Sequence, residues 1–330
     1  MASTAADTDV VRYLDAIREG IAAEMRDDDR VVLLGIDVGR GGGIFTVTRG
    51  LYEEFGPRRV RDTPISEAAF VGMAVGAAAA GLRPVVEIMF MDFLGVCFDP
   101  LLNQVSKLRY MTGGGLAFPL VVRTQTGAGR SSGAQHSQSL EAMLAHVPGL
   151  KVVLPATVGD AYGLMRSAIR DPDPVVYVEN RRLYGRRSAL AEHHDLPIGK
   201  ARIARSGSHV TVVAWSRLVE LALEAAEELA AEGIDAEVVD LRSLVPMDVD
   251  TVLESVRRTR RVVVAHEAVL DFGAGAEVAA RIYEGCFDAL AAPVERVGAP
   301  PVPLPFSPPL EEACIPSTDD VVAAIRKTLR

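Results

Sequence analysis

The sequence predicts an α/β protein with two doubly wound, mostly parallel sheets, one in each half of the chain. Three observations lead to this prediction. Short runs rich in β-branched residues alternate with segments of helical periodicity, the runs are apolar throughout, and the alternation pauses once near the middle of the chain. Continuous apolar strands that alternate with helices are typical of parallel sheets covered on both faces.

In the first half, the apolar runs predict strands over residues 31–38, 83–90, 118–124, 150–156 and 174–180. Two helices follow from spacing. Residues 9–27 place apolar side chains on one face behind Asp9, a plausible N-cap, and residues 158–170 form a helix that ends at the prolines of 171–174. A third helix begins at Glu67, and its run of Ala, Gly, Val and Met predicts that it is buried. The residues alone leave Glu67 open between a catalytic acid and an acid stabilised by the helix dipole.

The pattern pauses over residues 181–207, which are rich in charge and poor in periodicity. This pause sets the predicted domain organisation. The first domain covers residues 1–185, a linker covers 186–204, and the second domain covers 205–330.

The second half restarts the alternation. Strands are predicted over 209–215, 236–244, 260–268 and 294–300, and helices over 217–232, 248–258, 274–290 and 318–329. The Pro-rich stretch 299–316 predicts an extended arm that offers backbone to a partner surface.

Composition excludes several classes of function. The 330 residues carry a net charge of −9, which argues against a nucleic-acid binder. No apolar stretch is long enough to span a bilayer, so no membrane association is expected. The N-terminus lacks the basic and apolar regions of a secretory signal, and the three cysteines show no metal or redox spacing. We therefore expect a cytoplasmic protein with reduced thiols.

Two Gly-rich segments, 39–45 and 272–278, invite a nucleotide-binding interpretation. Each lacks a glycine at the third position of the dinucleotide fingerprint, and neither contains a Gly-Lys-Ser/Thr sequence. These failures argue against a nucleotide-binding dehydrogenase. His136 stands out by its setting, because it lies in a polar, Gly-rich loop after a buried strand, where ligands bind in parallel sheets. Its spacing fits equally an imidazole that only hydrogen-bonds the loop backbone.

Five longer segments carry a resemblance to a known family. They are DTPISEAAFVGMAVGAAAAGLRPVVE, DFLGVCFDPLLNQVSKLRYMTGG, AQHSQSLEAMLAHVPGLKVVLPAT, VVDLRSLVPMD and VVVAHEAVLDFGAGAE. On these segments the chain resembles, over nearly its whole length, the β subunit of the thiamine-diphosphate-dependent 2-oxo acid dehydrogenase component. Pyruvate, branched-chain and acetoin dehydrogenase complexes contain such subunits. The resemblance implies a pyrimidine-binding domain followed by a transketolase C-terminal-type domain.

The resemblance also implies roles for three residues. Glu67 matches the acid that hydrogen-bonds the aminopyrimidine ring of thiamine diphosphate and helps to activate it. An apolar surround favours the protonated form of a carboxyl group, which suits a group that holds and shares a proton. Phe93 matches the aromatic residue that stacks on the aminopyrimidine. His136 matches the histidine that holds the substrate-derived group or assists acyl transfer to a lipoyl carrier.

Metal ions and partners are implied in the same way. The Gly-Asp-Gly motif that holds magnesium at the cofactor's diphosphate is missing here. The family supplies it from a separate α subunit in an α2β2 assembly, which can dock on a lipoyl acyltransferase core. A structural potassium site, built largely from backbone carbonyls, is matched by Leu120, Ala168, Ile169, Asp171 and Asp173.

Several positions depart from the family pattern. Ile36 stands where the family's Gly-Glu-Asp-Val strand motif has its glutamate, and Arg181 and Arg182 replace acidic or apolar residues. These departures leave the substrate open. They also keep two alternatives open: a thiamine-dependent carboligase that needs no lipoyl partner, and a non-catalytic scaffold or regulatory subunit.

Overall fold

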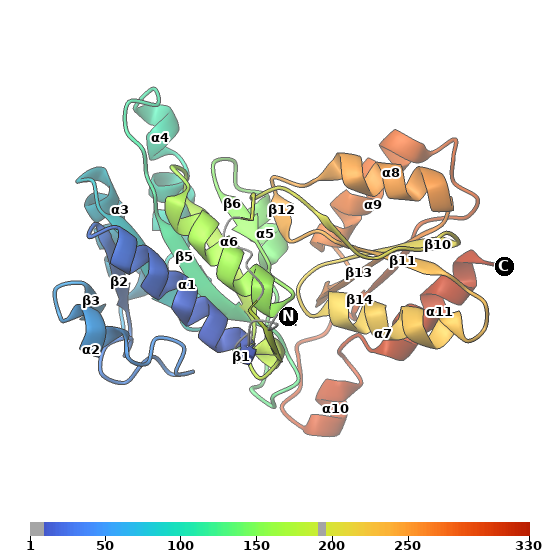
Figure 1. Ribbon diagram of the computed structural model, residues 1–330, viewed down its shortest axis with the longest axis horizontal. Helices are drawn as coiled ribbons and strands as arrows, with labels where there is room; N and C mark the ends of the chain where they lie inside the picture. Colours follow the sequence, from blue (N-terminus) through green and yellow to red (C-terminus); the bar gives the residue numbers. More distant parts are fainter. Residues whose placement is uncertain (1–9, 191–195) are drawn as a thin grey trace, which may run out of the picture.

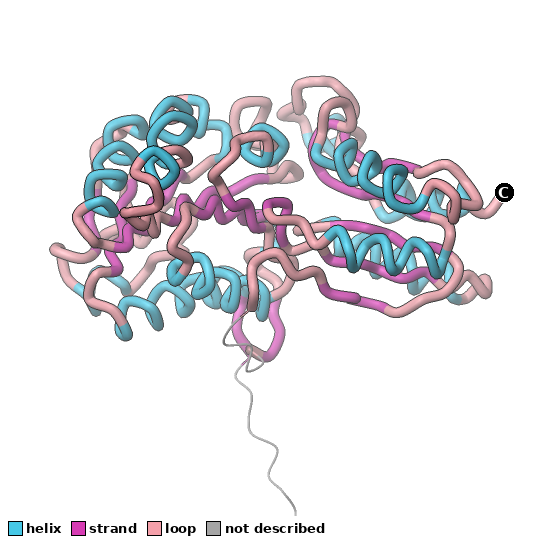
Figure 2. Tube along the Cα trace, turned by 90° about the horizontal axis from the view of Figure 1, so that it is seen from above, coloured by secondary structure: helices cyan, strands magenta, loops and turns pink. Residues whose placement is uncertain are grey.

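The computed structural model describes residues 10–190 and 196–330, which form two α/β units lying side by side (Figure 1). Figure 2 shows the strands of the first unit between two layers of helices, and Figure 1 shows the same arrangement for the second unit. The predicted fold class, two mostly parallel doubly wound sheets, is therefore confirmed. Within these residues no helix combines the length and the apolar character needed to cross a membrane.

The first unit is built on a seven-stranded sheet with the order β12-β6-β7-β5-β4-β2-β3. Every pairing in it is parallel except that of β12 with β6. The strands are β2 (Val31–Gly35), β3 (Val60–Asp62), β4 (Arg83–Ile88), β5 (Val121–Thr126), β6 (Lys151–Val153), β7 (Val175–Asn180) and β12 (Ser243–Val245).

Helices cover both faces of this sheet. Alternate residues of a strand point to opposite faces, so Leu33 packs with α1 (Tyr13–Asp27) and α6 (Val158–Arg170), while Leu34 packs with α3 (Glu67–Ala79). The second face is completed by η1 (Met91–Gly95), η2 (Pro100–Val105) and α5 (Glu141–Ala145), and shorter connections contain α2 (Leu51–Phe55) and α4 (Leu108–Met111).

The second unit has a five-stranded sheet with the order β14-β13-β10-β11-β9, in which only β9 is antiparallel to its neighbour. Its strands are β9 (Arg202–Arg205), β10 (Val210–Ala214), β11 (Ala236–Asp240), β13 (Val262–Val269) and β14 (Glu295–Ala299). One face packs on α7 (Leu218–Ala230) and α11 (Thr318–Thr328), the other on α8 (Val249–Thr259) and α9 (Ala274–Cys286).

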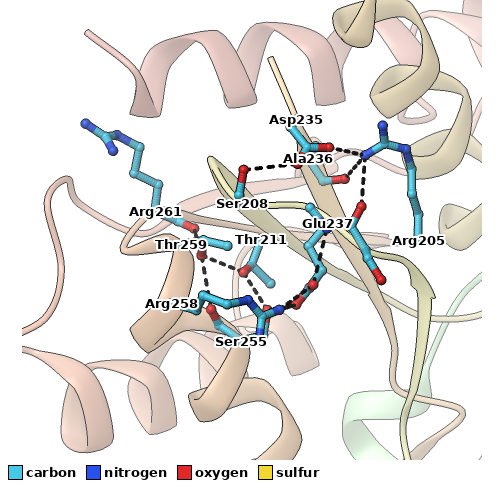
Figure 3. Close-up of polar contacts among 12 residues, drawn as sticks. Arg205, Ser208, Thr211, Asp235, Ala236, Glu237, Ser255, Arg258, Thr259 and Arg261 are labelled. Carbon is cyan, nitrogen blue, oxygen red and sulfur yellow. Dashed lines mark hydrogen bonds and ion pairs between the residues drawn. The ribbon is translucent and has the colours of Figure 1, made fainter. Parts of the chain in front are cut away.

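A buried carboxylate, Glu237 on β11, ties α8 to this second sheet (Figure 3). Its oxygens accept hydrogen bonds from the Ser255 hydroxyl at 2.6 Å and from the Arg258 guanidinium. The Ser255 hydroxyl also pairs at 2.7 Å with that of Thr211, which pairs with Thr259 at the same distance. The buried carboxylate and the three buried hydroxyl groups thus all have hydrogen-bond partners, as is usual for buried polar groups.

One predicted helix boundary in the first unit differs from the structure. Asp9, the predicted N-cap, lies outside the described residues, and α1 begins only at Tyr13. The residues just before it form β1 (Val10–Arg12), which pairs antiparallel with β8 (Arg187–Ala189). The segment that follows the first unit therefore contains regular structure, because it folds back onto the start of the described chain.

The prediction of one strand over residues 236–244 is wrong. The chain turns at Arg242, whose φ of 57° is left-handed, and leaves the second sheet after β11. It then adds β12 to the edge of the first sheet, where Ser243 pairs with Val153. The two units therefore share the segment 236–245. A continuous apolar run in a sequence does not show that its residues belong to two different sheets.

The prediction that the helix after Glu67 is buried holds for one face only. Residues such as Phe70, Val71 and Ala74 pack on the sheet. The opposite face is open: Met73 is exposed, and a side chain added at Gly72 or Gly76 would meet no atom within 4 Å. Helices that are apolar on all sides are normally buried on all sides, so this face of α3 is suited to cover by another chain.

Candidate active site

The loops that follow β3, β4, β5 and β7 leave the first sheet at the same edge, because these strands are parallel. Each loop brings one polar or aromatic residue to that edge. They are Glu67 at the start of α3, Phe93 in η1, His136 after β5, and Arg181 in η3 (Arg181–Leu183). Ligands of open α/β sheets bind at this carboxyl edge.

Phe93 and His136, both predicted from the resemblance, lie in contact. The ring of His136 stands edge-on to those of Phe90 and Phe93, with centroids 4.7 and 5.5 Å away. The backbone near it is fixed as well, since Gln138 donates to the Asp92 carboxylate from its backbone amide at 3.3 Å and from its side-chain amide at 2.8 Å. The imidazole is therefore held in a defined place against two aromatic rings that also contact each other.

Glu67 lies in the first turn of α3 and is 6% exposed. No group in residues 10–190 and 196–330 forms a hydrogen bond to its carboxylate. Burial, and then the charge of Glu67, raise the pKa of the Cys97 thiol to about 12, and Cys97 Sγ lies 3.8 Å from the Phe93 carbonyl oxygen. The charge of Glu67 thus acts on a residue just after η1. Although the residue as a whole is buried, its carboxylate oxygens keep contact with the surface, so they are open to a ligand.

Arg181 holds the loop that carries His136. Its guanidinium donates to the carbonyl oxygens of Gly127 at 2.8 Å and of His136 at 2.6 Å. It also lies over the rings of Phe90 and Phe45, 5.0 and 5.7 Å from their centroids. Burial lowers the pKa of Arg181. The sequence marked Arg181 only as a departure from the family, and this contact with the histidine loop could not be read from spacing.

Beneath this edge lies a buried ionic triad on three adjacent strands. Arg123 of β5 forms ion pairs with Glu87 of β4 and Glu179 of β7, and all three side chains are at most 2% exposed. Tyr184 donates to Glu179 at 2.6 Å. Burial raises the pKa of Glu179, and the charge of Arg123 opposes that shift. The triad fixes the strands from which Phe93, His136 and Arg181 extend.

Ile36, the departure from the family's acid, lies directly after β2. It is buried in the apolar cluster that contains Leu34 and Phe70, and Phe93 packs against the same cluster. This position therefore supplies apolar surface beneath the candidate site instead of a charge.

The residues matched to a potassium site lie at the opposite edge of the sheet. Leu120 precedes β5, and its carbonyl accepts from Val175 N at 2.9 Å, while the Ile169 carbonyl accepts from Arg83 at 2.9 Å. The carboxylates of Asp171 and Asp173 form ion pairs with Lys151 at 2.7 and 3.2 Å. The potassium site stays a prediction from the resemblance.

Two domain families match the chain. One, described as "Transketolase, pyrimidine binding domain", matches residues 9–187. The other, described as "Transketolase, C-terminal domain", matches residues 199–321.

Known proteins match the chain over nearly their full length. The subunit beta of acetoin:2,6-dichlorophenolindophenol oxidoreductase from Cupriavidus necator is 48% identical over 96% of both chains. The pyruvate dehydrogenase E1 component subunit beta from Rickettsia felis is 46% identical over 95% of this chain and 96% of that one. A solved structure titled "Split gene transketolase, inactive beta4 tetramer" superposes with a TM-score of 0.80 and 26% identity over 97% of this chain and 98% of that one.

Proposed function

Because the chain belongs to the transketolase-like family, among the β subunits of thiamine-diphosphate-dependent 2-oxo acid and acetoin dehydrogenase components, we propose that Glu67 activates the cofactor. The reaction is decarboxylation or C–C cleavage of a 2-oxo acid or acetoin, followed by transfer of the acyl group to a lipoyl carrier. The observation that carries the proposal is that Glu67, which accepts no hydrogen bond within the described residues, begins α3 at the same carboxyl edge of the sheet as Phe93 and His136. A carboxyl group placed at a reacting group can accept and release a proton.

The residues at the edge fit thiamine diphosphate. When bound there, the cofactor would supply a thiazolium carbon that is acidic enough to become a nucleophile towards a carbonyl group. Glu67 would hydrogen-bond a nitrogen of the aminopyrimidine ring and exchange a proton with it. Phe93, half-buried in η1, would stack on that ring. His136, packed against Phe90 and Phe93, would act at a later stage as a proton donor or acceptor to the acyl group.

The family implies an α subunit as partner, and the exposed face of α3 is the surface that we propose it covers. Glu67 begins this helix, so a chain that packs on Gly72, Met73 and Gly76 would also lie next to the proposed cofactor site. Small residues at such a contact let two backbones approach closely. We propose that the α subunit holds magnesium and the diphosphate, and that the assembly is α2β2, with docking on a lipoyl acyltransferase core.

The first expected outcome concerns the chain by itself. Without an α subunit it should bind thiamine diphosphate and magnesium too weakly for calorimetry to detect, because the sequence contains no Gly-Asp-Gly motif. Adding the α subunit should restore binding, which makes the mixture the positive control. Micromolar affinity of the chain alone would contradict the proposed division of the site between two subunits.

The second expected outcome concerns His136. Replacing it with Ala should lower the lipoyl-coupled rate about 100-fold or more, because one positioned proton-transfer group is lost. The rate with an artificial electron acceptor, which needs no acyl transfer to lipoate, should fall less than about tenfold. His146→Ala is the control, since His146 caps α5 and contacts neither aromatic ring. Equal loss in both assays would exclude a specific role in acyl transfer.

One observation favours a second candidate function. Ile36 makes the surface beneath the site apolar where the family has an acid, a departure that fits a specialised member of the family such as a carboligase that joins an activated aldehyde to an acceptor. The two functions are distinguished by supplying a lipoyl domain or an aldehyde acceptor to the assembled enzyme and identifying the product.

We also propose two further properties that rest on resemblance. A potassium ion would be bound largely by backbone carbonyls around Leu120, Ala168, Ile169, Asp171 and Asp173. A cytoplasmic location is inferred from the bacterial source of relatives such as the Cupriavidus necator subunit.

A further inference from the structure

The C-terminal segment reaches back to the loop that carries His136. Helix α10 (Pro308–Glu312) lies below the junction of the two units in Figure 1. Its Glu311 is 2% exposed and accepts hydrogen bonds from three consecutive backbone amides. Gly129 N and Ser131 N donate at 2.8 and 2.7 Å, and Arg130 N donates at 3.4 Å. Successive amides arranged around one anion form a nest that stabilises negative charge.

The loop has a conformation that this contact requires. Gly127, Gly129 and Ser131 all have positive φ, at 103°, 81° and 51°. A side chain at Gly129 would approach the guanidinium carbon of Arg182 to 2.6 Å. The loop is thus fitted tightly between Arg182 on one side and Glu311 on the other, and glycine is needed where the backbone is left-handed and crowded.

A second carboxylate from the same unit extends the contact. Glu267, near the end of β13, accepts from Ala128 N at 2.7 Å and from the Asn180 side chain at 2.7 Å. Four successive amides, those of residues 128–131, therefore donate to two carboxylates of the second unit. The carbonyls of Gly127 and His136 are held by Arg181 of the first unit. Both ends of the loop and its middle are fixed.

The charge of Glu311 makes this contact specific. Across residues 10–190 and 196–330, no Lys, Arg or His forms an ion pair with it. A buried carboxylate without a cation is stabilised only by its hydrogen bonds, and each bond to a charged acceptor is stronger than a neutral one. Movement of the loop away from Glu311 would leave the charge unsatisfied, so the carboxylate favours one loop position.

We propose that Glu311 is a positioning residue for His136, through which the C-terminal unit takes part in the acyl-transfer step. This inference rests on the proposed function of His136. The imidazole packs edge-on against Phe90 and Phe93, and a small shift of the loop would change its distance to a reacting group. A misplacement of about 1 Å can lower a rate about 100-fold. The arm 299–316, expected from the sequence to face a partner, thus also contacts its own chain.

The test is Glu311→Gln in the complex with the α subunit. Glutamine has nearly the same size, but its NH2 group would face backbone donors in place of a carboxylate oxygen. We expect kcat of the lipoyl-coupled reaction to fall about 10- to 100-fold, with KM nearly unchanged and a smaller loss with an artificial electron acceptor. Glu311→Asp should recover part of kcat, because it restores the acceptor charge with a shorter reach.

Amide hydrogen exchange, measured by mass spectrometry, gives a readout that does not depend on activity. Exchange in peptides covering residues 127–136 should rise in the Gln variant while other peptides stay protected. Glu312→Gln is the matched control, since Glu312 is the next residue of the same helix and is exposed. It should change neither exchange nor kcat. If Glu311→Gln fails to assemble, kcat and amide exchange are measured in Glu311→Asp instead. Wild-type values of both in that variant would then contradict the proposal.

Wild-type kcat in the Gln variant would overturn the proposal, as would an equal effect of Glu312→Gln or increased exchange throughout the chain. Failure of the proposed function gives a different result. In that case the wild-type complex would show no thiamine-dependent turnover at all, while exchange in residues 127–136 would still respond to Glu311→Gln.

Discussion

Replacing Glu67 with Gln is expected to lower turnover of the assembled enzyme about 10²- to 10⁴-fold, the usual loss when one positioned proton-transfer group is removed. Glutamine keeps the size of glutamate and one acceptor oxygen, so the packing of α3 should change little. It has no exchangeable carboxyl proton. Activation of the cofactor comes before every later step, so decarboxylation, lipoyl acylation and any carboligation should fall together.

The decisive measurement is hydrogen–deuterium exchange at the thiazolium carbon of thiamine diphosphate in the complex with the α subunit. Exchange should be slow in Glu67→Gln, and light scattering should show an unchanged assembly. Glu53→Gln is the control, because Glu53 is also an acid in the first turn of a helix but is exposed. Wild-type exchange in Glu67→Gln would mean that Glu67 only stabilises the start of α3.

The second large effect is expected for Arg123→Met, which should lower the free energy of unfolding by about 3–5 kcal/mol. Arg123 is 0% exposed and lies between Glu87 and Glu179. Removing its charge leaves two buried carboxylates next to each other without a cation. Since single domains are stable by only about 5–15 kcal/mol, this loss is large enough to unfold much of the first unit at moderate urea concentrations.

The urea midpoint of the complex, followed by circular dichroism, measures this loss. Arg109→Met is the control, because its ion pair with Asp173 is partly exposed, at 38% and 32%. Such pairs contribute at most about 1 kcal/mol. Adding Glu87→Gln and Glu179→Gln to Arg123→Met should recover part of the stability by removing the uncompensated charges. A midpoint for Arg123→Met as high as that of Arg109→Met would show that the triad does not stabilise the fold.

Much of the fold could be predicted because the strands are continuous apolar runs and the helices have a clear period. The runs at 83–90 and 174–180 correspond to β4 and β7, and the helix predicted over 158–170 has those same bounds in the structure. Contacts between distant segments could not be predicted in this way. The division of 236–244 between two sheets depends on the left-handed turn at Arg242, and single residues of that type carry little signal in a sequence.

The candidate site was predictable only through resemblance. Spacing alone marked His136 as a loop residue and left Glu67 open between a catalytic acid and a helix-terminal acid. The structure brings His136 and Phe93 into contact, while their roles stay predictions. Glu311 could not be found from the sequence, because it lies 180 residues from its amide partner Ser131 and no local pattern joins them.

Strand β12 has a consequence for how such a chain can be divided. It belongs to the second half of the sequence yet covers the outer edge of β6 in the first sheet. A fragment that ended between the two units would leave the outer edge of β6 unpaired, and bare strand edges recruit other chains into aggregates. Gene fragments or chimaeras cut at the apparent boundary would therefore need to carry residues 243–245 with the first unit. The linker between the two units is therefore not a position at which the chain can be cut into two independently stable parts.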